Sequence, residues 1–513
     1  MCAPFAGRPK GAGIHGIFMS GALYLGIDQG SSSTKGVLLS QAGEPVAHFQ
    51  IVAPPRIENE RSVEQDGEAI LSSVVDVFLK AKQLAHERGD RIAAAGLAVQ
   101  RSGVLAWRAV DGVPVHPMIT WADTRTFPII QSFGPRVEQI SEMTGLPTIP
   151  NFAAGKIHLL QRRFLEPSIK VGTLDTFLMY RLSGREAFVT DETMAARTML
   201  YSLKERGWSK QLCRDFKVDH SRLAEIRPSL APHATFEGVP IIGLIGDQQA
   251  AVFGRPGPEG YVLLNLGTIA SLLVDTGERI VQKPGLMTSV LLSQEQHAGA
   301  GVRRKYLVET TSPVTGSVLL ESVRREWCKD SSELQIMCED SYRNNPDGLA
   351  IAYFVNHRAL PPWYPERSPN VMLAKANATT ADKVRALVEN VGNIVARMIE
   401  EFEEKGLLGS GRDGEIVVTG GGSELDFLLQ YISDISGRTL HRMKTREATA
   451  RGAALGAMVA GGELDTIHAL NQEAPQRTYR AERPDRRRRY MMWQRLEQDT
   501  LNRRLPSQAD IEF

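Results

Sequence analysis

The sequence is poor in cysteine, and its few cysteines are far apart. Only four occur in 513 residues, Cys2, Cys213, Cys328 and Cys338, and no two have the C-x-x-C spacing. This pattern argues against a disulfide framework and against a structural zinc site. A reducing compartment fits such a composition, so we expect a cytoplasmic protein.

Long apolar runs and an excess of one charge are also absent. No stretch approaches the roughly 18 apolar residues that a membrane-spanning helix needs. The 60 Lys and Arg balance the 59 Asp and Glu, so a net charge of +1 creates no field that favours nucleic acid or an anionic membrane. We therefore expect neither as a partner. The 42% of hydrophobic residues is ordinary for a globular protein, and the length predicts about two to four domains.

Two familiar nucleotide motifs are missing or out of context. No G-x-x-x-x-G-K-[ST] sequence occurs, so a P-loop is not supported. G-x-G-x-x-G occurs at 11–16, but no strand precedes it and no βαβ unit surrounds it, so a dinucleotide-dependent oxidoreductase is only a distant alternative. Residues 1–22 lack a sustained apolar segment, and we interpret them as a disordered extension rather than a signal peptide.

The chain contains one strand–turn–strand plan twice. Residues 23–44 and 260–278 each hold an apolar strand, a small polar turn and a second strand closed by Gly-Glu. The turns contain residues 30–34 in the first copy and Gly267-Thr268 in the second. Small residues let backbone N–H groups approach an anion, and hydroxyls add donors. Two such hairpins could hold a polyphosphate from both sides of a cleft, which predicts ATP chemistry between two related domains.

A Pro- and Gly-rich stretch at 253–260 divides the chain into halves. Periodicity and terminal residues predict helices at 68–87, 156–164, 174–182, 309–327, 381–405 and 445–458, and apolar strands at 92–99, 239–245 and 416–419. Beyond about residue 474 the chain is charged, and we interpret the four arginines at 486–489 as a solvated helix start.

Several short motifs occur together in a fixed order. They are residues 26–30, 63–66, 100–101, 121–126, 175–178, 190–191, 196–200, 246–250, 420–423 and 447–450. In this order they resemble the FGGY family of carbohydrate kinases, and within it the glycerol kinases, from residue 23 to about 480. The resemblance implies an α/β fold of two actin-like ATPase (ribonuclease H-like) domains with a nucleotide cleft between them.

The resemblance also implies an organisation and an activity. It predicts an N-terminal domain at 23–254 for substrate and phosphate binding, a nucleotide-binding C-terminal domain at 255–473, and a charged segment at 474–513. It implies ATP-dependent phosphorylation of a hydroxyl group on a small sugar or polyol, with ATP and Mg²⁺ as cofactors. Homodimers and homotetramers are common in the family, so either assembly is expected.

Asp247 is the first candidate for catalysis. It follows an apolar strand in a Gly-Asp-Gln turn, from which a carboxylate can project into a cleft. A kinase that phosphorylates an alcohol needs an acceptor for the hydroxyl proton, and Asp serves this purpose at other phosphoryl-transfer sites. Asp is also a preferred helix N-cap, and the residues alone do not separate the two roles. The resemblance implies that Asp247 is the general base.

Asp28 ends a strand beside the first small turn. A carboxylate there could hold Mg²⁺ through water, although Asp also stabilises turns by itself. The resemblance implies the metal role for Asp28. It implies nucleotide contacts at Gly30, Ser31, Ser32, Lys35, Gly267, Thr268, Gly316, Gly421, Gly422, Ser423 and Asp426. The alternatives are a solvated strand residue at Lys35, a simple hairpin turn at Gly267, and a linker or turn at residues 420–423.

For the acceptor, the resemblance implies contacts at Arg101, Ser102, Trp121, Asp123, Asn151, Asp247 and Gln248. An ion pair is the alternative for Arg101, and a core position is the alternative for Trp121. Ser102, Asn151 and Ser271 stand where glycerol kinases have Glu, Tyr and Phe, and Lys35 replaces their usual Arg, which loses the bidentate fork. Asp123 also replaces a residue that is not acidic.

These departures change the size and the hydrogen bonding of the acceptor pocket. A site built to bond one set of hydroxyls rejects a different set by orders of magnitude. We therefore predict a sugar or polyol of four to six carbons in place of glycerol, with glycerol as the alternative. A non-catalytic ATP-binding protein of the same superfold is the rival to any kinase, because fold alone does not decide function. An ATPase unaffected by any sugar or polyol would favour that rival.

Overall fold

A computed structural model represents the chain. It describes residues 21–59, 61–257, 261–267, 269–296, 301–312, 317–353, 371–409, 414–445, 447–463 and 474–501. Thr268, Gly316 and nearly all of the N-terminal extension lie outside these ranges. No helix among the described residues is long and apolar enough to cross a membrane.

The first half of the chain contains most of the strands. They are β1 (Ala22–Gln29), β2 (Ser33–Ser40), β3 (Pro45–Val52), β4 (Ile57–Glu58), β5 (Val63–Gln65), β6 (Arg91–Val99), β7 (Val104–Arg108), β8 (Pro114–Ile119), β9 (Ile169–Thr173), β10 (Val189–Asp191), β11 (Tyr201–Ser202), β12 (Gly207–Trp208), β13 (Glu225–Arg227), β14 (Leu230–Phe236) and β15 (Val239–Gly246). The helices are α1 (Gly67–Glu87), α2 (Phe127–Gln131), α3 (Arg136–Thr144), α4 (Ala153–Arg163), α5 (Leu174–Leu182), α6 (Glu192–Ala195), α7 (Lys210–Asp215) and α8 (Asp247–Gly254), with a 3₁₀ turn at His220–Arg222.

The second half alternates strands with longer helices. The strands are β16 (Val262–Leu266), β17 (Ala270–Gly277), β18 (Met287–Glu295), β19 (Val302–Ser312), β20 (Ala350–Tyr353), β21 (Val371–Ala374), β22 (Ile416–Thr419), β23 (Leu440–Arg442) and β24 (Arg477–Tyr479). The helices are α9 (Ser317–Trp327), α10 (Ser331–Asn344), α11 (Thr380–Glu404), α12 (Asp426–Ser436), α13 (Ala448–Ala460) and α14 (Arg486–Leu501), with the 3₁₀ helix η4 (Gly421–Glu424).

Most predicted elements are confirmed, but the helix predicted at 309–327 is wrong at its start. Glu309 lies in β19, and the helix begins only at Ser317. Val308, Thr310 and Thr311 are β-branched, which favours a pleated strand over a helix. The strand is also paired on both sides, because Glu309 stands opposite Leu273 of β17 and Met287 of β18. Tertiary pairing therefore places an acidic side chain inside the sheet.

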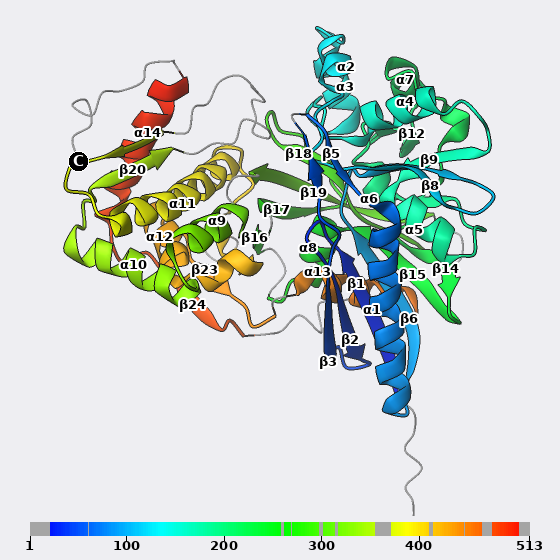
Figure 1. Cartoon of the computed structure of the whole chain (residues 1–513), viewed down its shortest axis with the longest axis horizontal. Coiled ribbons are helices and arrows are strands. Elements are labelled where there is room, and N and C mark those ends of the chain that lie inside the picture. The colour runs from blue at the N-terminus through cyan, green and yellow to red at the C-terminus, as the bar shows by residue number, and fades with distance from the viewer. Residues whose placement is uncertain are drawn as a thin grey trace, which may run out of the picture.

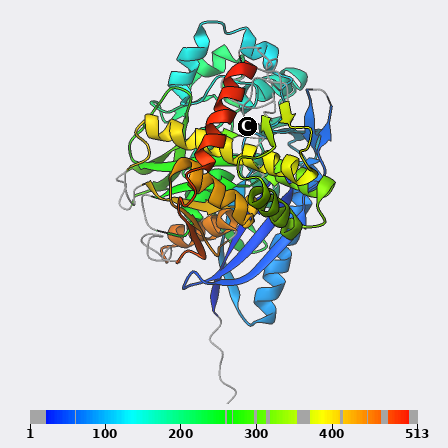
Figure 2. The same ribbon diagram turned by 90° about the vertical axis from the view of Figure 1, so that its left-hand side faces the viewer.

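One sheet runs through both halves of the molecule. Its order is β24-β23-β22-β16-β17-β19-β18-β14-β15-β6-β1-β2-β3, so the second half supplies one end and the first half the other (Figure 1). The halves meet where β14 runs parallel to β18, with Leu230 opposite Gln294 as the one register pair. Seen from the side of the second half, the yellow α11 and the red α14 lie in front of the sheet (Figure 2). The two predicted hairpins are β1–β2 and β16–β17, both antiparallel.

Helix α13 belongs to the second half of the sequence but packs on strands of the first. A Cβ atom on Gly26 of β1 would lie 1.9 Å from the carbonyl oxygen of Ala450, so only glycine admits the helix at this distance. Helices α13 and α8 touch in the same way, since a Cβ on Gly452 would lie 2.0 Å from the oxygen of Ala250. The helix predicted at 445–458 is confirmed from Ala448 onward, and its small residues permit this close packing. It brings the starts of α8 and α13 to one cavity.

The arginine run starts a helix, as predicted, but it is not fully solvated. Arg487 and Arg488 are exposed, whereas Arg486 and Arg489 are 2% and 4% exposed. Arg486 pairs with Asp434 at 3.0 Å, and Arg489 pairs with Glu389. Residues three apart share one face of a helix. Arg486 and Arg489 therefore lie on the buried face of the helix, and Arg487 and Arg488 lie on its exposed face. The prediction of a solvated helix start is wrong for Arg486 and Arg489.

Candidate active site

A cavity of about 380 Å³ is lined by residues from both halves of the sheet. Its wall contains the predicted site residues Gly30, Ser31, Ser32, Lys35, Arg101, Ser102, Trp121, Asn151, Asp247, Gln248, Gly267 and Gly421. These residues span almost 400 positions of the sequence. The arrangement of two small-residue turns around one hollow follows from the β1–β2 and β16–β17 hairpins.

The first small turn is held from behind by a buried glutamine. Gln65 donates from Nε2 to the carbonyl oxygens of Ser31 at 3.1 Å and Pro54 at 2.8 Å. The turn is closed by the N–H of Gly30, which donates to the oxygen of Ser33 at 3.0 Å. Ser31 and Ser32 therefore stand on a fixed backbone at the cavity wall, as a phosphate-binding turn requires.

Lys35 also lines the cavity, and it is paired with an acid from the other half. Its Nζ lies 2.8 Å from Oε2 of Glu447, which directly precedes α13. Both side chains remain a little under one-third exposed. The pair joins the two halves at the end of the cavity near the first turn.

Asp28 lies behind this turn, opposite Lys35 in the β1–β2 register. Burial and the charge of Asp247 raise the pKa of Asp28 to about 7, Lys35 opposes the shift, and Glu447 adds to it. The carboxylate is thus short of positive charge. No group of three or more His, Cys, Asp or Glu close enough to hold a metal occurs among the described residues. A cation at Asp28 would therefore not be held by a cluster of protein acids of that size, and Mg²⁺ commonly takes its remaining ligands from water and phosphates.

Asp247 is the first residue of α8 and faces the cavity with 25% of its side chain exposed. Its Oδ1 accepts the N–H of Gln248 at 2.7 Å and lies 3.2 Å from Nε of Arg101. Burial raises the pKa of Asp247, Arg101 and the N–H of Gln248 oppose that rise, and Glu309 adds to it. The cap-like contact and the cavity-facing position therefore occur together. A raised pKa makes this carboxylate a stronger base than an exposed one.

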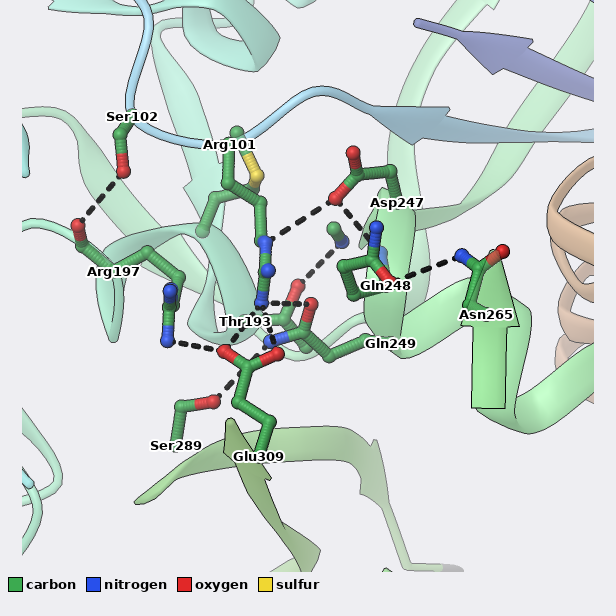
Figure 3. A network of polar contacts seen from close by, with 12 residues as sticks. Arg101, Ser102, Thr193, Arg197, Asp247, Gln248, Gln249, Asn265, Ser289 and Glu309 are labelled. Carbon is green, nitrogen blue, oxygen red and sulfur yellow. Dashed lines mark hydrogen bonds and ion pairs between the residues drawn. The ribbon is translucent and has the colours of Figure 1, made fainter. Parts of the chain in front are cut away.

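Arg101 is the centre of a buried network (Figure 3). Its Nη1 donates to Oε1 and Oε2 of Glu309 at 2.9 and 3.1 Å, and to Oε1 of Gln249 at 3.2 Å. Arg197, which also lines the cavity, pairs with the same Glu309. Burial and the neighbouring Arg101 lower the pKa of Arg197 to about 9. The ion-pair alternative for Arg101 is thus realised, although Arg101 still lines the cavity.

Another part of the wall is built around a buried lysine. Lys156 of α4 is fully buried and donates from Nζ to the carbonyl oxygens of Ser102 at 3.1 Å and Asn151 at 2.5 Å. Asn151 in turn donates from Nδ2 to the oxygen of Trp121 at 3.1 Å. Ser102 has a φ of 65°, which is uncommon for a residue other than glycine. These hydrogen bonds join three segments of the chain, around Ser102, Trp121 and Asn151, behind the wall of the cavity.

Asp123 and Ser271 are not among the residues that line the cavity. Asp123 is fully buried, and its carboxylate accepts the N–H of Val63 at 2.8 Å and the guanidinium of Arg125. All of these contacts are structural. Ser271 lies fully buried in β17, paired with Thr311 of β19. Neither position contributes a side chain to the cavity wall, so the prediction that Asp123 contacts the acceptor is not supported by its place in the structure.

The glycine loop after β22 contributes only its first part to the cavity. Gly420 and Gly421 line it, while Gly422 and Ser423 are buried behind them. The hydroxyl of Ser423 donates to the oxygen of Gly420 at 2.6 Å and so closes the loop. Asp426 lines a separate pocket on the second half, where it binds Arg442, Arg477 and Tyr479.

Several lining residues were not predicted from the sequence. The main polar ones are Gln50, Gln100, Arg197, Asn265, Thr311, Thr419, Glu447 and Thr449. Arg197 and Glu447 belong to two of the ordered motifs, at 196–200 and 447–450. The motifs were therefore recognised, but no site role was predicted for these two residues. Asn265 donates from Nδ2 to Oε1 of Gln248 at 3.1 Å, a contact between halves that sequence separation conceals.

The duplicated hairpins and the acid at their shared cavity fit the ATP-dependent carbohydrate kinases that are built from two actin-like domains. The chain belongs to the FGGY family of carbohydrate kinases: residues 23–254 match the N-terminal domain of that family and residues 262–461 match its C-terminal domain. The predicted family and fold are confirmed.

Curated relatives and solved structures agree with this assignment. Glycerol kinases from two strains of Cereibacter sphaeroides are 29% and 30% identical over 85% of this chain and 90% of theirs. The crystal structure of Plasmodium falciparum glycerol kinase with ADP has a TM-score of 0.80 at 23% identity, covering 94% of this chain and 99% of that one. Gluconate kinase from Lactobacillus acidophilus has a TM-score of 0.79 at 19% identity, covering 96% and 99%.

Proposed function

We propose that this kinase transfers the γ-phosphoryl group of Mg·ATP to a hydroxyl of a sugar or polyol larger than glycerol, with Asp247 as general base. One observation carries the proposal: the Asp247 carboxylate, held by Arg101, faces a cavity that is also lined by the small turns of both halves. A proton acceptor and two phosphate-binding turns in one hollow are what phosphoryl transfer to an alcohol requires.

The roles follow from where each side chain stands. Asp247 accepts the proton of the attacking hydroxyl, and its raised pKa favours that transfer. Arg101 fixes the carboxylate through Oδ1, which leaves Oδ2 for the hydroxyl. Gly30, Ser31, Ser32 and Lys35 hold the phosphates from the first half, and Gly267 holds them from the second. The family resemblance adds Thr268, which lies outside the described residues. Closure of the halves excludes water and suppresses ATP hydrolysis.

Mg²⁺ fits Asp28 because burial and the neighbouring Asp247 raise the pKa of this carboxyl group, so a cation beside it would be stabilising. When bound with the nucleotide, the cation neutralises phosphate charge. For the adenosine, Gly421 on the cavity wall is the proposed contact, with Gly422 and Ser423 holding the loop. The family resemblance adds Gly316, which lies outside the described residues. Asp426 would take part only if its contacts with Arg442 and Arg477 were exchanged.

The acceptor pocket is proposed to use Arg101, Ser102, Trp121, Asn151 and Gln248. Support comes from their shared position on the cavity wall. Ser102 and Asn151 are short side chains where the glycerol kinase pattern has Glu and Tyr, so the wall recedes at both places. Asp123 contributes indirectly, through Arg125 and the backbone of Val63. A four- to six-carbon acceptor fits such a wall better than glycerol.

The proposal is tested by measuring ADP release with Mg·ATP across C3–C7 polyols, ketoses, aldoses and sugar acids, glycerol included. We expect strong release with one larger compound and little with glycerol. Strong glycerol activity would contradict the proposed acceptor class. Bound ATP without acceptor-dependent release would favour the non-catalytic rival.

The base is tested separately with Asp247→Asn. Loss of a general base lowers turnover by at least about a hundredfold, whereas ATP binding, measured by calorimetry, stays nearly unchanged. Asp76→Asn, at an exposed position of α1, removes a carboxylate outside the cavity and is the control. Near-normal turnover in Asp247→Asn would remove Asp247 from the catalytic role.

A further inference from the structure

Glu309 is the residue through which the second half reaches the proposed base. It lies in β19 between two paired strands, so its backbone is fixed on both sides. Arg101, Arg197 and Asp247 all come from the first half. Glu309 itself is fully buried and is not among the residues that line the cavity, so it does not touch a bound acceptor directly.

The contacts form a short chain from β19 to the base. Both carboxylate oxygens of Glu309 accept Nη1 of Arg101, at 2.9 and 3.1 Å. The Nε of the same guanidinium lies 3.2 Å from Oδ1 of Asp247. A guanidinium is planar and rigid, so fixing one edge fixes the direction of the other. Figure 3 shows Arg101 between the two carboxylates.

Glu309 also keeps two buried cations together. Arg101 and Arg197 both pair with it, and their side chains are 8% and 6% exposed. Burial alone would raise the pKa of Glu309, but the two arginines hold that pKa below its usual range, so the carboxylate is charged. If Glu309 lost its charge, the two buried guanidinium groups of Arg101 and Arg197 would be left with Asp247 as the acid that balances them. Arg101 would then be drawn toward Asp247.

We propose that Glu309 is a positioning residue for the kinase reaction: it orients Arg101, and through Arg101 it orients Asp247. The inference rests on the proposed function of Asp247. It makes the geometry of the base depend on β19, so the base in the first half is complete only when the second half is in place. Transfer to the acceptor is then coupled to the approach of the two halves.

The test is Glu309→Gln, studied by kcat/KM against pH with an acceptor that the wild type phosphorylates. We expect kcat/KM for the acceptor to fall about 10- to 100-fold, since small misplacement of a reacting group costs this much. The Michaelis constant for ATP should stay unchanged. The acid limb of the profile should move to lower pH, because the charge of Glu309 no longer raises the pKa of Asp247. The other charged groups that act on Asp247 are kept, namely Arg101, Arg197 and Asp28. Lys35 and Glu447, which act on Asp28, are also kept.

Glu192→Gln is the matched control. Glu192 of α6 is 3% exposed and pairs with Arg304, another residue of β19 about 17 Å along the strand from Glu309. This variant also removes a buried carboxylate that joins the halves. We expect a loss of stability similar to that of Glu309→Gln, with the acid limb unmoved. An acid limb that is unmoved in Glu309→Gln as well would overturn the proposal and leave Glu309 a purely structural residue.

Glu309→Asp keeps the test valid if Glu309→Gln does not fold. This variant keeps the negative charge, but its side chain is one methylene shorter, so the carboxylate lies farther from Arg101. We expect a lower kcat/KM for the acceptor, an unmoved acid limb and an unchanged Michaelis constant for ATP. Equal losses for ATP and acceptor, or no loss, would overturn the proposal. A wild-type protein that transfers phosphate to no acceptor removes the proposed function itself and this inference with it, whereas an active wild type isolates the result for Glu309.

Discussion

Lys156→Met is the substitution whose effect can be worked out most fully from the structure. The ammonium group is fully buried and donates to two carbonyl oxygens, those of Ser102 and Asn151. Replacing it leaves both carbonyls without this donor, at about 1–3 kcal/mol each. It also removes an amine that burial disfavours: burial lowers the pKa of Lys156 from 10.5 to about 7, against the attraction of Asp123.

These two effects differ in their dependence on pH. Between the folded pKa of about 7 and the unfolded value of 10.5, the unfolded wild type binds one proton more than the folded protein. Wild-type stability therefore rises with pH in this window. In this window the free energy of unfolding increases by about 1.4 kcal/mol for each pH unit. The increase is smaller near pH 7, because the folded Lys156 itself titrates there. The total increase from pH 7 to 9 is therefore about 2 kcal/mol. Lys156→Met lacks this rise.

The assay is urea unfolding at pH 7, 8 and 9 without nucleotide, followed by circular dichroism. We expect Lys156→Met to be less stable than the wild type at pH 9, with the gap about 2 kcal/mol smaller at pH 7. Lys80→Met, on the exposed face of α1, is the control, and its difference in stability from the wild type should be the same at pH 7, 8 and 9. A gap for Lys156→Met that stays constant from pH 7 to 9 would refute the reasoning. In the kinase assay, the Michaelis constant should rise for the acceptor but not for ATP.

Two further substitutions test other parts of the molecule. Asp28→Asn should weaken Mg²⁺ binding in the presence of ATP by at least about tenfold, measured by Mg²⁺ titration of ADP release. Because burial and Asp247 raise the pKa of Asp28 from 3.8 to about 7, wild-type stability falls as pH rises through this range; Asp28→Asn should thus be the more stable protein at pH 8 and equal at pH 4 in thermal melts without Mg·ATP. Arg486→Met leaves Asp434 buried without its pair and should cost about 3–5 kcal/mol. Arg487→Met, at an exposed position, should cost less than about 0.5 kcal/mol in the same denaturation series.

The parts of the site that sequence reasoning located are those that local chemistry determines. The turn at residues 30–34 and the Asp247 turn each combine a strand end with small or acidic residues, and the structure places both at the cavity. Such signals are contained in a few adjacent positions. The same is true of helix bounds: α5 occupies Leu174–Leu182, as periodicity predicts.

The parts that were missed depend on contacts between distant segments. Glu309 was predicted at the start of a helix, and only the pairing of β19 with β17 and β18 makes it a buried partner of Arg101. Lys156 was predicted only as the first residue of a helix, because its contacts with the carbonyl oxygens of Ser102 and Asn151 depend on how the chain folds. Asp123 shows the converse: its motif was recognised, but Arg125, two residues away, takes up the carboxylate.

The contact between α8 and α13 limits how the two halves can move. At Gly254 and Gly452 the helices meet backbone to backbone, since a Cβ on Gly254 would lie 2.1 Å from the oxygen of Ala448. Helix α13 also meets the backbone of β6, since a Cβ on Gly96 would lie 1.9 Å from the oxygen of Ala453. It is therefore anchored to the first half together with α8, and the starts of the two helices, with Asp247 and Glu447, keep their separation. Any movement of the rest of the second half has to take place around this anchored pair of helices.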